Sequence, residues 1–78
     1  MTQTARDWLA SFAAEVGIAP LTAQEIDLLL ELAGTAAHAS ERQAAPLTCW
    51  LAARAGVDPR QALDVAKGLA AKLAPGEP

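Results

Sequence analysis

Side chains that commonly carry chemistry are scarce in this chain of 78 residues. It contains one cysteine, Cys49, one histidine, His38, and no tyrosine. A single cysteine excludes a disulfide within the chain, and one cysteine with one histidine is too little for a structural zinc site. We therefore expect no metal ion and no cofactor, and this cysteine content suits a reducing, cytoplasmic location.

Positive charge and long apolar runs are also lacking. Six Lys and Arg residues stand against nine Asp and Glu, and the basic residues are scattered. Nucleic acid is not expected as a partner, because its binding needs a basic patch. Asp27 and Glu31 interrupt the most hydrophobic region, and the N-terminus carries Arg6 and Asp7 without an apolar signal core. We expect neither a membrane partner nor secretion.

Apolar residues, many of them alanine, make up 53% of the chain, and charged residues make up 19%. This composition is typical of a folded protein. Because alanine buries little area, we expect the core to depend on Leu, Ile and Val together with Trp8, Phe12 and Trp50. Burying one large side chain contributes about 1.5–3 kcal/mol, and a chain this short has little core. We therefore expect self-association, with a homodimer as its simplest form.

Helical signals recur along the whole chain, and strand signals are absent. The first predicted helix begins after Thr4 as N-cap and ends before Gly17. In the second, Thr22 and Glu25 have the spacing of a capping box, and a polar stripe continues to about His38. This second helix is apolar around most of its surface and is predicted to be the central one.

The start of the third helix has two interpretations. Ser40 and Gln43 have the spacing of a second capping box, whereas Pro46 suits the first position of a helix. In either case the helix ends at Gly56, and a fourth helix follows with Asp58 as its N-cap.

These elements predict an all-α fold, a compact four-helix bundle-like single domain over residues 1–74. Residues 75–78 contain two prolines and are predicted to form a disordered tail. Within the second helix, Gly34 costs about 1 kcal/mol relative to alanine, unless it allows close packing of another helix.

The densest polar cluster lies at the predicted junction between the second and third helices, where His38, Ser40, Glu41 and Arg42 follow one another closely. One interpretation is a binding site, since connections often carry function. The other is structural: His38 lies exposed in the last turn of one helix, while Ser40 and Glu41 favour the start of the next.

Arg54 is unusual because it shares a helical face with Leu47, Trp50 and Leu51. A cation on an apolar face needs a partner or access to water. Arg54 either extends over Trp50 with its charged end in water, or forms an anion site with Arg42.

Catalytic and metal-binding arrangements have little support. A nucleophile would need Cys49 or Ser40 beside His38, the only histidine that can act as a base. A metal site built from His38, Glu41 and Cys49 lacks a second histidine at helical spacing.

Several segments together resemble a known family. They are Asp7-Trp8-Leu9, His38 to Arg42, Ala45 to Thr48, Trp50-Leu51 and Arg54 to Gly56. The family resembled is a small bacterial all-helical domain of unknown function, found alone or attached to the nucleotidyltransferase that makes molybdopterin-guanine dinucleotide. The resemblance implies an accessory module near molybdenum-cofactor maturation, with that enzyme as its protein partner. It implies no catalytic residues.

The leading hypothesis is a non-catalytic helical interaction module that binds a protein partner or itself. The candidate binding residues are His38, Ser40, Glu41, Arg42, Trp50 and Arg54. The alternative is a domain that binds a small anionic ligand or a nucleotide through Arg42, Arg54 and His38. A third hypothesis, an enzyme that uses His38 as an acid or base with Glu41 or Cys49, rests on residue types alone.

Overall fold

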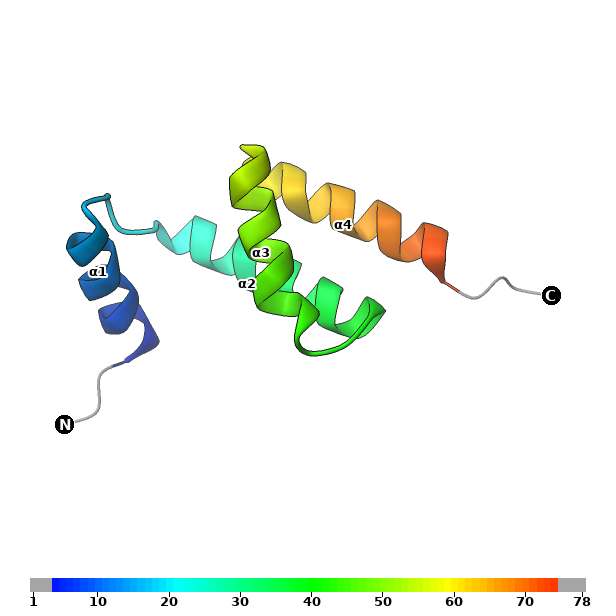
Figure 1. Ribbon diagram of the computed structural model, residues 1–78, viewed down its shortest axis with the longest axis horizontal. Helices are drawn as coiled ribbons and strands as arrows, with labels where there is room; N and C mark the ends of the chain where they lie inside the picture. Colours follow the sequence, from blue (N-terminus) through cyan, green and yellow to red (C-terminus); the bar gives the residue numbers. More distant parts are fainter. Residues whose placement is uncertain (1–3, 75–78) are drawn as a thin grey trace.

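The computed structural model describes residues 4–74, which form four helices and no strand (Figure 1). The helices are α1 (Ala5–Val16), α2 (Ala23–Ala39), α3 (Ala44–Ala55) and α4 (Pro59–Leu73). The predicted all-α, four-helix bundle-like fold is confirmed. The tail predicted at residues 75–78 lies outside the described residues. None of the helices within residues 4–74 has the length and hydropathy needed to cross a membrane.

Side-chain caps start three of the helices as the sequence predicts. The Thr4 hydroxyl accepts a hydrogen bond from the Asp7 N–H at 3.0 Å. Thr22 and Glu25 form the predicted capping box, each side chain accepting from the other residue's N–H. The Asp58 carboxylate accepts from the N–H of Gln61 at 2.8 Å. Each cap satisfies a backbone donor that the helix itself leaves unpaired.

Glycines end α1 and α3 in the left-handed conformation. Gly17 has a φ of 82° and Gly56 a φ of 75°, a region that residues with a β-carbon adopt at a steric cost. At the end of α1, the N–H of Gly17 donates to the Ala14 carbonyl and the N–H of Ile18 to the Ala13 carbonyl. These bonds satisfy carbonyls of the last turn and fix the direction in which the chain leaves the helix.

The predicted capping box of Ser40 and Gln43 is wrong. Ser40 ends α2, and its N–H donates to the Ala36 carbonyl at 3.0 Å. Gln43 is the N-cap of α3 and makes no side-chain cap bond. Backbone hydrogen bonds, and no side-chain cap, therefore stabilise the polar turn between the two helices.

Pro46 occupies the third position of α3, which begins at Ala44 and matches neither of the two interpretations. The N–H groups of Ala44 and Ala45 donate to the carbonyls of Glu41 and Arg42, at 2.9 and 3.1 Å. A donor at the third position has no partner within a helix, so a proline there leaves nothing unsatisfied.

The core lies where α2 meets α3 and α4, which confirms α2 as the central helix. Leu32 of α2, with 1% of its surface exposed, packs with Ala62 and Leu63 of α4. The half-buried residues around this cluster are Leu28, Leu29, Cys49, Ala52, Val57 and Ala66. Most side chains on α3 and α4 that face α2 are therefore small, and they bury little area each.

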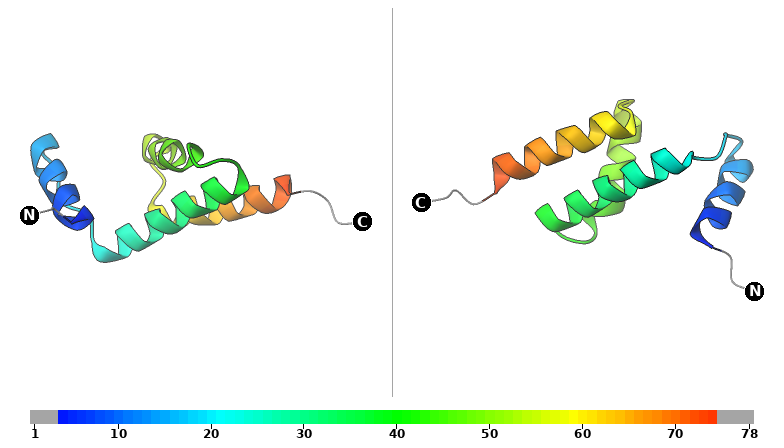
Figure 2. Two further views of the ribbon diagram at one scale, coloured as in Figure 1. Left: turned by 90° about the horizontal axis from the view of Figure 1, so that it is seen from below. Right: turned by 180° about the vertical axis from the view of Figure 1, so that it is seen from behind.

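The prediction that Trp8, Phe12 and Trp50 contribute to the core is wrong, because their exposed fractions are 58%, 55% and 65%. Figures 1 and 2 show α1 standing apart from the other helices in every view. Ala13 is the only buried residue of α1. Trp50 lies on the side of α3 opposite Cys49 and Ala52, the residues that pack toward the core.

Helices α2 and α4 run side by side in the same direction, while α3 crosses over one side of the pair (Figures 1 and 2). An ion pair between Lys67 Nζ and Glu31 Oε2, 3.0 Å long, joins the two helices. Both side chains are exposed, so the pair contributes at most about 1 kcal/mol to stability. Beyond it, residues of the C-terminal halves of α2 and α4 line a cleft.

Gly34 and Gly68 lie inside α2 and α4, and a β-carbon added at either residue would meet no atom within 4 Å. Gly34 therefore does not serve close helix packing within the chain. Glycine in a helix interior carries an entropic cost that alanine avoids.

We expect Gly34→Ala and Gly68→Ala each to raise the free energy of unfolding by about 0.5–1 kcal/mol, since both positions are helical and open. Urea denaturation followed by circular dichroism measures the change. A loss of stability in Gly34→Ala with a gain in Gly68→Ala would contradict this account, because it would show that something packs against Gly34.

Candidate functional site

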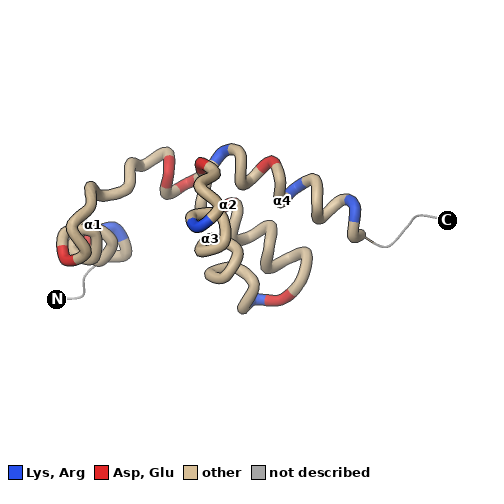
Figure 3. The backbone as a smooth tube through the Cα atoms, turned by 45° about the horizontal axis from the view of Figure 1, so that its top comes forward, with Lys and Arg blue, Asp and Glu red and all other residues tan. Residues whose placement is uncertain are grey.

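Many large apolar side chains lie on the outside of the molecule. Thirteen large hydrophobic side chains of residues 4–74 are exposed, whereas four residues form the buried set. Scattered apolar residues are normal on a protein surface, but contiguous patches mark interaction sites. Charged residues are spread over the four helices and do not gather into a field of one sign (Figure 3). The apolar patches are therefore the first candidates for a site.

The first patch is the outer α3 stripe, which we define as Leu47, Trp50, Leu51 and Arg54. The three apolar members have exposed fractions of 61%, 65% and 58%, and Arg54 is also exposed. At 100° per residue they fall within about 100° of the helix surface. The predicted shared face thus exists and points to solvent, which gives the Arg54 guanidinium access to water.

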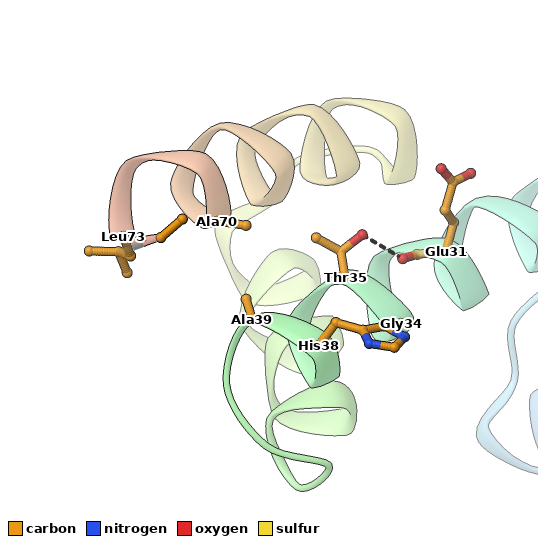
Figure 4. A pocket seen from close by; sticks show the side chains of 8 residues that line it. Glu31, Gly34, Thr35, His38, Ala39, Ala70 and Leu73 are labelled. Atoms are coloured by element: carbon orange, nitrogen blue, oxygen red, sulfur yellow. Dashed lines mark hydrogen bonds between the residues drawn. The ribbon is translucent and has the colours of Figure 1, made fainter. Parts of the chain in front are cut away.

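His38 lines a cleft of about 650 Å³ between the C-terminal halves of α2 and α4 (Figure 4). Its polar groups, on Glu31, Thr35 and His38, all belong to α2, and the α4 side is formed by Ala70, Leu73 and Ala74. The Thr35 hydroxyl donates to the Glu31 carbonyl at 2.9 Å, so it is already engaged by its own helix.

The structure does not bring the other polar candidates into this cleft. Glu41 and Arg42 lie exposed in the turn between α2 and α3, where the Glu41 carboxylate accepts a 3.4 Å hydrogen bond from the Gln43 amide. Arg42 and Arg54 flank opposite ends of α3, about 15 Å apart along its axis. A small anion held by both arginines is not supported by this arrangement.

Cys49 faces inward, and its Sγ lies 4.0 Å from the Leu29 carbonyl oxygen of α2. Burial raises the pKa of the Cys49 thiol above its usual value of 9.0, because burial disfavours the charged thiolate. The thiolate is the reactive form, so this cysteine is poorly suited to nucleophilic catalysis. No three His, Cys, Asp or Glu side chains of residues 4–74 form a group that could hold a metal ion.

A second hollow, which we call the apolar groove, was not predicted from the sequence. It has a volume of about 370 Å³ and lies among α2, α3 and α4, with Leu32 among its lining residues. Its lining includes Ala36 and Ala39 of α2, Leu51 of α3, and Val65 and Leu69 of α4, and it contains no charged residue. Ser40 is the one residue of the predicted polar cluster that lines it. The signal in the sequence was the run of small residues on the facing sides of these helices.

The model of a protein family described as a domain of unknown function, DUF6457, matches residues 1–77. The chain belongs to this family. No curated protein and no solved structure matches it. This family match confirms that the chain is an all-helical domain of unknown function, as the resemblance predicts.

The raised pKa of Cys49 predicts an alkaline loss of stability. A group whose pKa is higher in the folded state stabilises fully below its unfolded pKa, and this contribution disappears as the pH rises through the folded value. We expect the free energy of unfolding to fall more steeply above about pH 9 in the wild type than in Cys49→Ala. Urea denaturation between pH 7.5 and pH 10 in both proteins measures this, and equal slopes would contradict it.

Proposed function

We propose that this chain is a non-catalytic helical module that binds a protein partner through the outer α3 stripe. The observation that carries the proposal is the exposure of Trp50 between Leu47 and Leu51, beside the guanidinium of Arg54. Tryptophan and arginine are the residues most enriched among those that dominate binding energy at protein interfaces. Helix α3 is held to α2 by its opposite side, so the stripe is available to a partner.

The partner we propose is the nucleotidyltransferase that makes molybdopterin-guanine dinucleotide. This part of the proposal rests on the resemblance of the segments around His38 and Trp50 to domains attached to that enzyme. Glu41 and Arg42 lie exposed in the turn before α3, and His38 and Ser40 at the end of α2 are the further candidates. Polar residues around an apolar centre are typical of the rim of an interface.

Binding of a small anion or nucleotide has less support. The cleft beside His38 carries Glu31 on the same wall, and neither Arg42 nor Arg54 lines it. A carboxylate in the cleft opposes the binding of an anion. Binding of a protein partner, in contrast, does not require several positive charges close together.

We expect Trp50→Ala and Arg54→Ala each to weaken binding to the nucleotidyltransferase at least tenfold, since both remove an exposed anchor of the stripe. Calorimetric titration of the enzyme with each variant measures the change. Helix content should remain intact, because neither side chain belongs to the core. Leu30→Ala, at a residue 67% exposed on α2, is the matched control and should bind like the wild type.

Absence of binding by the wild-type chain would refute this choice of partner. Binding that survives both α3 substitutions but is lost in a variant of the His38 to Arg42 segment would instead move the interface to the polar turn.

A further inference from the structure

The chain exposes more surface than a folded monomer of its size. Its accessible surface is 6203 Å² for a mass of 8.0 kDa. Folded monomeric proteins of that mass expose about 4,450 Å². Allowing roughly 150 Å² for each of the residues outside the described range, 1–3 and 75–78, still leaves an excess of about 700 Å². A surface excess of this size, formed by large apolar side chains, indicates faces that are covered in the working form of the protein.

One such face is the apolar groove. It lies between α2 and α4, and residues of α3 line one side of it. Its volume of about 370 Å³ corresponds to roughly a dozen water molecules against walls that offer few hydrogen bonds. Because a charge in such surroundings is costly, the occupant must present an uncharged surface. A hollow of this volume can accept a few large apolar side chains, such as those on one face of a helix.

The other face belongs to α1. Trp8, Phe12 and Val16 recur at the spacing of one helix face, and each is more than half exposed. Leu9 adjoins them with 37% of its surface exposed. An amphipathic helix of this length is unstable in water unless its apolar side is packed against something. Helix α1 is therefore the one element of the described chain that lacks a packing partner along its apolar side.

The connection between α1 and α2 opposes packing of α1 into the groove of its own chain. Gly17 and Thr22 fix the two ends of this connection through their cap hydrogen bonds, and Pro20 restricts the backbone between them. The α2 lining of the groove begins at Leu32, about 14 Å along the helix from its first residue. Folded back along α2, Trp8 would reach only about 12 Å from Val16.

We propose that two copies of this chain form a dimer in which α1 of each copy packs its apolar side into the apolar groove of the other. Short, restrained connections favour such an exchange over closure within one chain. The excess surface of two chains is about 1,400–3,500 Å², a range that covers what standard and many obligate interfaces bury. Because each copy inserts its own α1 and receives the α1 of the other, the pairing is reciprocal and closes at two copies.

This inference rests on the premise of the proposed function that exposed apolar faces of this chain are interfaces, but it concerns different elements. The dimer uses α1 and the groove, whereas the proposed partner binds the outer α3 stripe. Leu51 is the one residue that the stripe and the groove share. Variants of α1 and α4 therefore test the dimer separately from the partner.

The test measures the mass of the full chain by light scattering coupled to size-exclusion chromatography. Phe12→Glu places a charge on α1, and Leu69→Lys places one in the groove; both residues are more than half exposed, so neither change disturbs the core. We expect the wild type to have twice the mass of 8.0 kDa, and each variant to raise the dissociation constant at least tenfold. Leu30→Glu, on the outer side of α2, is the control and should remain dimeric.

Mixing the Phe12→Glu and Leu69→Lys variants is the decisive experiment. A mixed dimer contains one unaltered α1 packed in an unaltered groove. At its other contact the two substituted side chains, which carry opposite charges, lie together. Mixing should therefore restore the dimer. Dimers that survive both substitutions, or that are lost in both but not restored by mixing, would overturn the proposed exchange.

A wild-type chain that is monomeric at all concentrations and binds the nucleotidyltransferase would refute the dimer and leave the proposed function standing. A dimer that behaves as expected without any binding of the enzyme would do the reverse. Equal uptake of a small apolar fluorophore by Phe12→Glu and by the wild type at its highest concentration would show that α1 does not cover the groove, and would refute the exchange.

Discussion

The packing of small side chains around Leu32 is the constraint on which the rest of the structure depends. Ala52 on α3 and Ala62 and Ala66 on α4 let both helices approach α2. Side-chain caps fix where α1, α2 and α4 start. Such faces bury little apolar area, so many large apolar side chains remain exposed to solvent. The surface chemistry of this protein is thus a direct consequence of how its core is made.

Local signals in the sequence were sufficient to predict the helices. Hydrogen bonds over three or four residues define the caps of Thr4, Thr22 and Asp58, and no distant contact competes with them. Ser40 failed as a cap because the turn from Glu41 to Gln43 satisfies the first donors of α3 with backbone carbonyls. A spacing rule based on side chains cannot distinguish these two solutions.

Burial was harder to predict than helix position. Periodicity identifies an apolar face but not what covers it, so Trp8, Phe12 and Trp50 were assigned to the core although all are exposed. Periodicity also could not predict the apolar groove, because its residues come from three helices that lie apart in the sequence. Among the predicted site residues, Trp50 and Arg54 do share an exposed face, whereas His38 and Arg42 lie in separate surroundings.

The most direct measurement is the accessibility of Trp8 to a neutral quencher such as acrylamide in a Trp50→Phe variant, in which Trp8 is the only tryptophan. If apolar faces of two copies cover each other, Trp8 is shielded at high protein concentration and its emission shifts to longer wavelength on dilution, while Trp50 in a matching Trp8→Phe variant stays accessible throughout. Full accessibility of Trp8 at the highest concentration would contradict the account.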